Sequence, residues 1–243
     1  YWRVVEEVLF ISDLHLDKQR PEMVERFVSF IKNRASYANE LYILGDLFEY
    51  WIGDDDPAEE MQPAIQAIAS LHDKNVPVYF IHGNRDFLIS SKFSSITKCK
   101  ILDEHVVIDL FGQPTLIMHG DTLCIDDISY QKFRKKARNK IIQKSFLFLS
   151  LKTRLSVANY LRKQSAKAIS EKPAYIMDVN QDAVIAAMQK YNAYNLIHGH
   201  THRPDIHRFT LDNKDAKRIV LGDWYATSTA LSYGQEGFKI INV

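Results

Sequence analysis

Leu196-Ile197-His198-Gly199-His200-Thr201-His202-Arg203 is an apolar run that passes into three histidines at every second position. On a strand end, residues two apart project to the same side, so His200 and His202 are expected to reach a pair of adjacent cations. Gly199 before them lets the backbone turn sharply. The stretch therefore predicts a strand that ends in metal-binding histidines, and oxygen ligands at other strand ends would complete the site.

Four further apolar runs end in polar residues of the kinds that bind metals. The runs are Val8–Ser12, Leu41–Leu44, Val78–Ile81 and Thr115–Met118. They lead into Asp13-Leu14-His15, Gly45-Asp46, His82-Gly83-Asn84-Arg85-Asp86 and His119-Gly120-Asp121. In α/β sheets, ligands bind beyond the carboxyl ends of strands, so we expect these groups to converge on one cleft.

The spacing of apolar residues predicts the remaining elements. Helical spacing favours helices from Pro21 to about Ser36, from about Glu59 to Lys74, and from Val179 to Lys190. Alternation of strand, polar loop and helix is typical of an α/β sheet. The segments 106–110 and 115–118 flank Phe111-Gly112-Gln113-Pro114 and predict a hairpin, while the apolar runs 219–221 and 238–241 are expected to close the sheet.

Length and composition are those of an ordinary globular protein. The chain has 243 residues and is 46% hydrophobic and 25% charged, which an α/β fold accommodates as one unit. Two cysteines are too few for a disulfide framework, so we expect a reducing compartment. The sequence has no charged leader and no run of about 18 apolar residues, which argues against export and against a membrane span.

Charge is distributed unevenly along the chain. Residues 131–172 contain thirteen Lys or Arg and one acid, a net charge of +12. The rest of the chain carries 18 basic and 29 acidic residues, a net charge of −11. The basic segment is expected to form two or three helices, and the asymmetry predicts that part of the surface meets an anionic partner.

The ligands at the predicted strand ends are oxygens and imidazoles, with no thiolate. Such a set suits Mn²⁺, Fe²⁺, Zn²⁺ or Mg²⁺, and about seven ligands are too many for one metal. A single Asp at a strand end is more often a turn former, and a single His such as His119 is more often a satisfied buried imidazole. The metal interpretation therefore depends on the whole set and its order.

Taken together, the Asp-x-His, Gly-Asp, Gly-Asn, His and Gly-His-x-His motifs resemble the calcineurin-like metallophosphoesterase superfamily. The resemblance implies a β-sandwich flanked by helices and a site with two metals. One metal would be held by Asp13, His15, Asp46 and His202, and the other by Asp46, Asn84, His119 and His200. Asp46 would bridge them, and the same residues together with Arg85 would form the catalytic set.

Arg85 stands where many members of the superfamily have a histidine that helps to protonate the leaving group. Arginine does not give up its proton at neutral pH, but its planar fork binds phosphate oxygens. A leaving group that is itself a phosphate needs little protonation. Arg85 therefore favours cleavage of a diphosphate over cleavage of an alkyl ester.

Longer strings are similar to those of the bacterial UDP-2,3-diacylglucosamine hydrolase family, among them Trp51-Ile52-Gly53-Asp54-Asp55, His82–Leu88 and His198–Arg203. This resemblance implies attack of water on the α-phosphorus to give UMP and 2,3-diacylglucosamine 1-phosphate (lipid X), a step of lipid A synthesis that uses Mn²⁺. It also implies a set of residues that contact the substrate, namely Asn84, Arg85, Asp127, Tyr130, Arg162, Ser165, Lys172 and His200.

The basic segment is predicted to form a lid at residues 125–175, inserted into a core made of residues 1–124 and 176–243. Phe146–Leu151 is apolar and lies among lysines and arginines, as in a helix that touches a bilayer or lines an acyl-chain groove. The alternative is a core helix with a solvated basic edge. The lid interpretation implies a monomer bound peripherally to the cytoplasmic face of the inner membrane, with no nucleic-acid partner.

Two other functions are compatible with parts of the sequence. One is a dinuclear metallophosphoesterase that acts on nucleotides or nucleic acid, against which Arg85 and the apolar lid argue. The other is a non-catalytic protein that binds anions or a membrane surface, against which the complete ligand set argues. Release of UMP from a diacylated UDP-sugar would distinguish these three functions.

Overall fold

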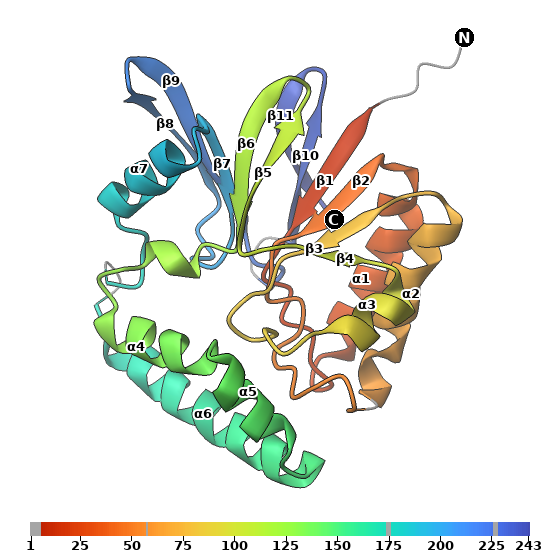
Figure 1. Cartoon of the computed structure of the whole chain (residues 1–243). Helices are drawn as coiled ribbons and strands as arrows, with labels where there is room; N and C mark the ends of the chain where they lie inside the picture. The colour runs from red at the N-terminus through yellow and green to blue at the C-terminus, as the bar shows by residue number, and fades with distance from the viewer. Residues whose placement is uncertain (1–5, 57, 174–175, 226–227) are drawn as a thin grey trace.

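Two β-sheets form the centre of the computed structural model, which describes residues 6–56, 58–173, 176–225 and 228–243, with only the backbone at 166 and 169–171 (Figure 1). The first sheet has the strand order β11 (Gly237–Asn242), β10 (Thr229–Gly234), β1 (Glu7–Ile11), β2 (Glu40–Ile43), β3 (Val78–Phe80) and β4 (Lys100–Ile101). The second has the order β5 (His105–Leu110), β6 (Gln113–Met118), β7 (Asn195–His198), β9 (Lys214–Val220) and β8 (Asp205–Leu211).

Parallel pairing brings the ends of the ligand-bearing strands to one edge of each sheet. In the first sheet β1, β2 and β3 are parallel, with Ile43 paired both to Ile11 and to Phe80. In the second sheet β6 and β7 are parallel, with Ile117 opposite Ile197. Every residue of β1 is buried, as expected for a parallel strand covered on both faces. The loops that follow these five strands therefore lie at the same end of the two sheets (Figure 1).

Helices cover the outer faces of the two sheets and complete four layers. An apolar core between the sheets includes Phe10, Ile117 and Ile197. A second core joins the first sheet to α1 (Pro21–Asn33), α2 (Gln62–Asp73) and α3 (Ser91–Thr97), and a third joins the other sheet to α7 (Gln181–Lys190). The predicted α/β fold, a β-sandwich flanked by helices, is confirmed.

Three helices of the basic segment lie together at the bottom of Figure 1, beside the strand-end loops and away from the outer helices. They are α4 (Ile128–Ala137), α5 (Lys140–Leu147) and α6 (Leu151–Glu171). Asp127 caps α4 by accepting from the N–H of Tyr130, and Asn139 caps α5. The division at residues 125–175 stays a prediction, and its end falls at 174–175, outside the described residues.

Several predicted boundaries differ from the structure. The expected 111–114 connection is a two-residue turn, because Gln113 pairs with Leu110 and both Phe111 and Gly112 have positive φ. The helix expected to reach Ser36 ends at Asn33, before a short 3₁₀ turn at 35–37. The helix expected from Glu59 begins as a 3₁₀ turn at 59–61. The last predicted helix starts at Gln181, because Asn180 caps it.

The sequence interpretation missed four elements: α3, β4, β8 and β10. Strand β8 pairs with β9 through a turn at Asp212-Asn213, where both residues have positive φ. Asn and Asp favour that conformation in two-residue hairpins, so this turn had a sequence signal. Strand β10 joins the sheet next to β1, with Phe10 opposite Leu231.

Candidate active site

The predicted metal ligands come together in the loops after β1, β2, β3, β6 and β7. Two groups each have ligand atoms within 4.8 Å of one another, Asp13 with His15 and His202, and Asp13 with Asp46 and His119. Asp46 Oδ2 lies 3.8 Å from the Nε2 atoms of both His15 and His119. Asp46 therefore lies between the two sets of residues that the sequence assigned to different metals.

The remaining two predicted ligands lie on the His119 side of the cluster. Asn84 Oδ1 is 3.0 Å from His119 Nε2, and the ring centroids of His119 and His200 are 5.0 Å apart. The backbone N–H of His200 donates to Asp13 Oδ2 at 2.8 Å, which ties the loop after β7 to the loop after β1. All seven predicted ligands thus surround one small volume.

Five of the seven ligands have a left-handed backbone. Their φ angles are 55° for Asp13, 49° for His15, 52° for Asp46, 71° for His200 and 55° for His202. Non-glycine residues rarely adopt this region, at a cost of about 1–3 kcal/mol each, and keep it only where their surroundings impose it. Since β7 ends at His198, the expectation that His200 and His202 project from a strand was wrong. Their side chains converge because of the loop conformation.

Two glycines are required here by close contact between loops. A Cβ atom at Gly83 would lie 2.0 Å from Asp46 Oδ1, and one at Gly199 would lie 2.2 Å from Asp13 Oδ2. The backbone itself supplies hydrogen bonds at the same point, because the N–H of Arg85 donates to Asp46 Oδ1 at 2.8 Å. A side chain at Gly83 would therefore displace the carboxylate that lies between the two groups.

Three histidines have an oxygen within 3.2 Å of Nδ1. His119 Nδ1 is 2.8 Å from the carbonyl oxygen of Leu44, His15 Nδ1 is 3.0 Å from Glu49 Oε2, and His202 Nδ1 is 3.2 Å from Asp223 Oδ2. An oxygen at Nδ1 favours a proton there and leaves Nε2 free to bind a metal. The sequence interpretation missed Glu49 and Asp223. Glu49 follows Asp46 by three positions, a proximity that could have marked it.

The residues present fit a divalent metal ion. Asp13 Oδ1 is buried and accepts no hydrogen bond from the residues that the structure describes. Burial alone would raise the pKa of Asp13, but the imidazole of His202, with Nε2 3.3 Å from Asp13 Oδ1, and the charges of other nearby histidines hold it well below its usual range. Burial lowers the pKa of His200 to about 4, so its imidazole is neutral at pH 7. An ionised Asp13 and a neutral His200 are in the form that binds a metal. Burial lowers the pKa of His15, but contact with Glu49 and the nearby carboxylates raises it to about 8, so His15 would release a proton on binding a metal.

Predicted substrate contacts from the core and lid lie on the border of this cluster. Arg85 Nη1 is 3.8 Å from Glu49 Oε1, and Arg162 of α6 reaches the same oxygen with Nε at 3.1 Å. The ring of Tyr130 lies with its centroid 5.9 Å from that of His200. Asn84 and His200 are within the cluster itself.

The other predicted substrate contacts lie further along the lid. Lys172 Nζ donates to both oxygens of Asp127, at 2.8 and 2.7 Å, which joins the two ends of the lid. Ser165 is half-buried on α6, about one turn beyond Arg162. The structure thus places Asp127, Lys172 and Ser165 in the lid rather than among the metal-binding groups.

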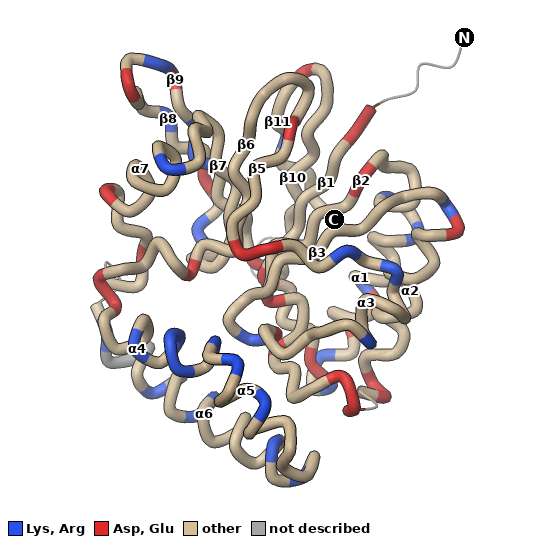
Figure 2. Tube along the Cα trace, in the orientation of Figure 1, with Lys and Arg blue, Asp and Glu red and all other residues tan. Residues whose placement is uncertain are grey.

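Arginines of the lid pair with acids of the core, which the sequence interpretation did not anticipate. Figure 2 shows Lys and Arg gathered along α4, α5 and α6. Arg154 is 1% exposed, donates to the carbonyl of Ile52 at 2.6 Å and forms a two-armed ion pair with Asp55. Arg134 donates to Asp121 and Glu104 at 2.6 and 2.7 Å. Part of the charge asymmetry therefore holds the lid to its own core.

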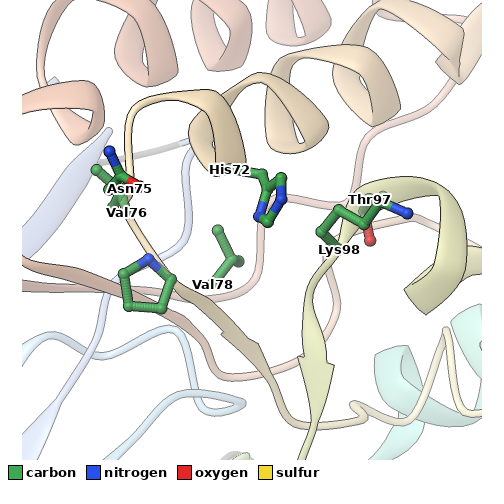
Figure 3. Close-up of a pocket in the computed structure, with 7 residues that line it drawn as sticks. His72, Asn75, Val76, Val78, Thr97 and Lys98 are labelled. Carbon is green, nitrogen blue, oxygen red and sulfur yellow. The ribbon is translucent and has the colours of Figure 1, made fainter.

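A small cavity lies at the other end of β3. It has a volume of about 220 Å³ and is lined by His72, Asn75, Val76, Pro77, Val78, Thr97 and Lys98 (Figure 3). Val78 begins β3, whereas Asn84 follows its carboxyl end. The cavity and the cluster of predicted metal ligands therefore lie at opposite ends of β3.

Comparisons with known proteins agree with this geometry. A family model described as calcineurin-like phosphoesterase matches residues 7–204. A UDP-2,3-diacylglucosamine hydrolase of Nitrosococcus oceani is 48% identical over 229 residues, covering 94% of this chain and 92% of that protein. One of Photobacterium profundum is 47% identical over 232 residues, covering 96% and 95%. A solved archaeal phosphodiesterase has a TM-score of 0.51 at 13% identity, covering 98% of this chain and 99% of that chain, which supports the fold.

Proposed function

The chain belongs to the calcineurin-like phosphoesterase family, and on that basis we propose that it hydrolyses the diphosphate of UDP-2,3-diacylglucosamine. The products would be UMP and 2,3-diacylglucosamine 1-phosphate, as in lipid A synthesis. The observation that carries the proposal is the position of Asp46 Oδ2, 3.8 Å from a histidine of each predicted metal group. The similarity to UDP-2,3-diacylglucosamine hydrolases, and the lid beside the cluster, support the choice of substrate.

Asp13, His15, Asp46 and His202 would hold one divalent ion, and Asp46, Asn84, His119 and His200 the other. Two such ions, for which we propose Mn²⁺, would supply a hydroxide nucleophile and stabilise charge at phosphorus. Their four positive charges exceed the two negative charges of Asp13 and Asp46, so the site would attract a diphosphate.

Arg85 acts on the substrate as a cation rather than as an acid. Its guanidinium lies at the border of the cluster, with Nη1 3.8 Å from Glu49. It binds phosphate oxygens through its planar guanidinium fork and orients the α-phosphorus. The departing sugar phosphate leaves as an anion, so the reaction needs no general acid at this position.

The lid, residues 125–175, would hold the acyl chains and contact the membrane surface. Phe148 is 90% exposed, Ile141 76% and Leu149 42%. Exposed lysines lie on α4, α5 and α6, namely Lys132, Lys135, Lys136, Lys140, Lys144, Lys152 and Lys163. Apolar side chains among lysines suit an anionic bilayer. Phe146, by contrast, is partly buried and packs against the core that joins the first sheet to α1, α2 and α3, so it helps to hold the lid to the core.

A peripheral position on the cytoplasmic face of the inner membrane follows from this role for the lid. Among the described helices, none is both long and apolar enough to cross a bilayer. We propose that the protein acts as a monomer, because one chain supplies all seven ligands and the lid. No part of the proposed site requires a nucleic acid.

The deciding experiment is hydrolysis of UDP-2,3-diacylglucosamine by metal-free protein, with and without added Mn²⁺, in ¹⁸O-labelled water. We expect UMP to form only with metal and to carry the label, because water attacks the α-phosphorus. Asp46→Ala should reduce the rate by at least about 100-fold. Label in the sugar phosphate would refute attack at the α-phosphorus, and unchanged hydrolysis by Asp46→Ala would refute the site.

A further inference from the structure

Glu49 occupies a fixed position between the predicted metal cluster and the lid. Its N–H donates to the carbonyl of Leu16 at 3.0 Å, and the N–H groups of His15 and Leu16 donate to the carbonyls of Asp46 and Leu47, both at 2.9 Å. The loops after β1 and β2 are therefore joined along their backbones. This joining sets where the Glu49 side chain can reach.

The carboxylate of Glu49 contacts groups of two kinds with its two oxygens. Oε2 lies 3.0 Å from His15 Nδ1. Oε1 lies 3.1 Å from Arg162 Nε of the lid and 3.8 Å from Arg85 Nη1 of the core. The side chain is 18% exposed, so these contacts are largely shielded from water.

Both arginines are the cations expected to bind the diphosphate. Carboxylate and phosphoryl oxygens accept from a guanidinium fork in similar geometry, so Glu49 and a diphosphate compete for the same donors. Arg162 has a second anion, because its Nη2 donates to Asp17 Oδ2 at 3.2 Å. Within the described part of the chain, Asp17 forms no hydrogen bond or ion pair with His15. Asp17 thus offers a comparison that separates the two roles of Glu49.

We propose that Glu49 is a positioning residue with two tasks, a proposal that rests on the function proposed above. One oxygen orients His15 so that its Nε2 faces Asp13 and Asp46. The other holds Arg85 and Arg162 together as a placeholder anion until the diphosphate replaces it. The same carboxylate therefore joins the metal cluster to the lid.

The test compares Glu49→Gln, Glu49→Ala and Asp17→Asn in the full chain. Mn²⁺ affinity is measured by competition with a chromophoric chelator. Binding of α,β-methylene-UDP, which resists hydrolysis, is measured by calorimetry on the Mn²⁺-loaded protein at low salt. Neither readout depends on turnover of the lipid substrate, so failure of the proposed function would not disturb them.

Glu49→Gln keeps an oxygen for His15 but removes the charge, so we expect Mn²⁺ affinity within about threefold of wild type and nucleotide binding several-fold tighter. Glu49→Ala should lower Mn²⁺ affinity about 10–100-fold, because His15 loses its support. Asp17→Asn should leave Mn²⁺ affinity unchanged. Adding Arg162→Ala to Glu49→Gln should remove much of the tightening.

Two results would overturn the proposal. Weaker nucleotide binding by Glu49→Gln would mean that the carboxylate supports the arginines without competing with phosphate. Unchanged Mn²⁺ affinity in a folded Glu49→Ala protein would mean that Glu49 does not position His15. A purely structural role predicts losses in both readouts and cannot produce tighter nucleotide binding.

Discussion

The strand-end loops hold their side chains through backbone contacts, whereas the helices of the lid are held to the core through charged side chains. In the loops, Asp13 and Asp46 accept hydrogen bonds from the N–H groups of His200 and Arg85, and Gly83 leaves no room for a methyl group. In the lid, Arg154 and Arg162 reach acids of the core from the long helix α6.

This difference suits the two regions to different tasks, holding side chains in a fixed geometry and exchanging one bound anion for another. Backbone hydrogen bonds and close packing fix atoms without long flexible side chains, which suits ligands that must keep a set geometry. The carboxylate partner of an arginine can be replaced by another anion of similar shape, such as a phosphate. Such pairs suit a surface that must release one partner to bind another. Substitutions in the loops are therefore expected to cause large losses of activity, and substitutions in the lid smaller and graded losses of function.

The largest effect is expected from Gly83→Ala, which adds a single methyl group to the strand-end loops. Its Cβ would lie 2.0 Å from Asp46 Oδ1, so the carboxylate must move. A displacement of about 1 Å at reacting groups costs on the order of 100-fold in rate. Hydrolysis of UDP-2,3-diacylglucosamine and bound Mn²⁺ should both fall, as measured by UMP release and metal analysis.

Gly112→Ala provides the matched control for that substitution. Gly112 lies in the β5–β6 turn at φ 79°, and a Cβ there meets nothing within 4 Å. We expect a stability loss of about 1 kcal/mol from the left-handed backbone and unchanged hydrolysis. Near-normal activity of Gly83→Ala would contradict the view that the loops tolerate no displacement.

An intermediate effect is expected when exposed apolar groups of the lid are changed. Phe148→Ser with Leu149→Ser removes two exposed side chains without touching the ion pairs to the core. Loss of about 2 kcal/mol of apolar contact with lipid corresponds to roughly 30-fold weaker binding. Sedimentation with vesicles of phosphatidylethanolamine and phosphatidylglycerol measures it.

Tyr37→Ser tests whether exposure alone explains such a loss. Tyr37 is 78% exposed but lies beyond α1, among the helices of the first sheet. Vesicle binding should be unchanged by this substitution. If both variants lost binding equally, or neither did, the lid would have no special part in contact with lipid.

The smallest effect is expected for Arg154→Ala, which removes one ion pair between lid and core. Asp55 retains a largely exposed side chain, so the loss is mainly that of the hydrogen bonds to Asp55 and Ile52, about 1–2 kcal/mol. Amide hydrogen exchange in α6 should become roughly tenfold faster while β1 and β2 keep their protection.

Lys152→Ala, at an exposed position on the same helix, should leave exchange in α6 unchanged. If Arg154→Ala instead accelerated exchange throughout β1 and β2, lid and core would form one cooperative unit. The contrast between the two regions would then be wrong.

The sequence predicted the sheet core and the composition of the ligand cluster because both follow short-range rules. Apolar strands that end in Asp13, Asp46 and His119 showed which side chains would meet, since parallel strands share an edge. The left-handed backbone of His200 and His202 was not predictable from spacing, because it accompanies contacts with distant loops, such as the hydrogen bond from the N–H of His200 to Asp13. His200 and His202 do approach the cluster, but through a loop conformation and not through the expected alternation of a strand.

Contacts between distant segments account for most of what the sequence interpretation missed. Asp223 contacts His202 from 21 positions further along the chain, and Glu49 meets Arg162 across 113 positions. No local pattern records such a pairing. The basic composition of residues 131–172 predicted an anionic partner, but it could not separate cations that face outward from Arg134 and Arg154, whose partners lie within the molecule.

The position of β10 beside β1 has a consequence for biosynthesis. The first ligand, Asp13, accepts at its carbonyl from the N–H of Trp224, and Asp223 follows Asp13 by 210 positions. At about 5–20 residues per second, a ribosome needs roughly 10–40 s to make the intervening chain. Until then β1 lacks one neighbour and His202 lacks its carboxylate. Metal capture at the proposed site is therefore expected only after Asp223 has been made, 210 residues after Asp13.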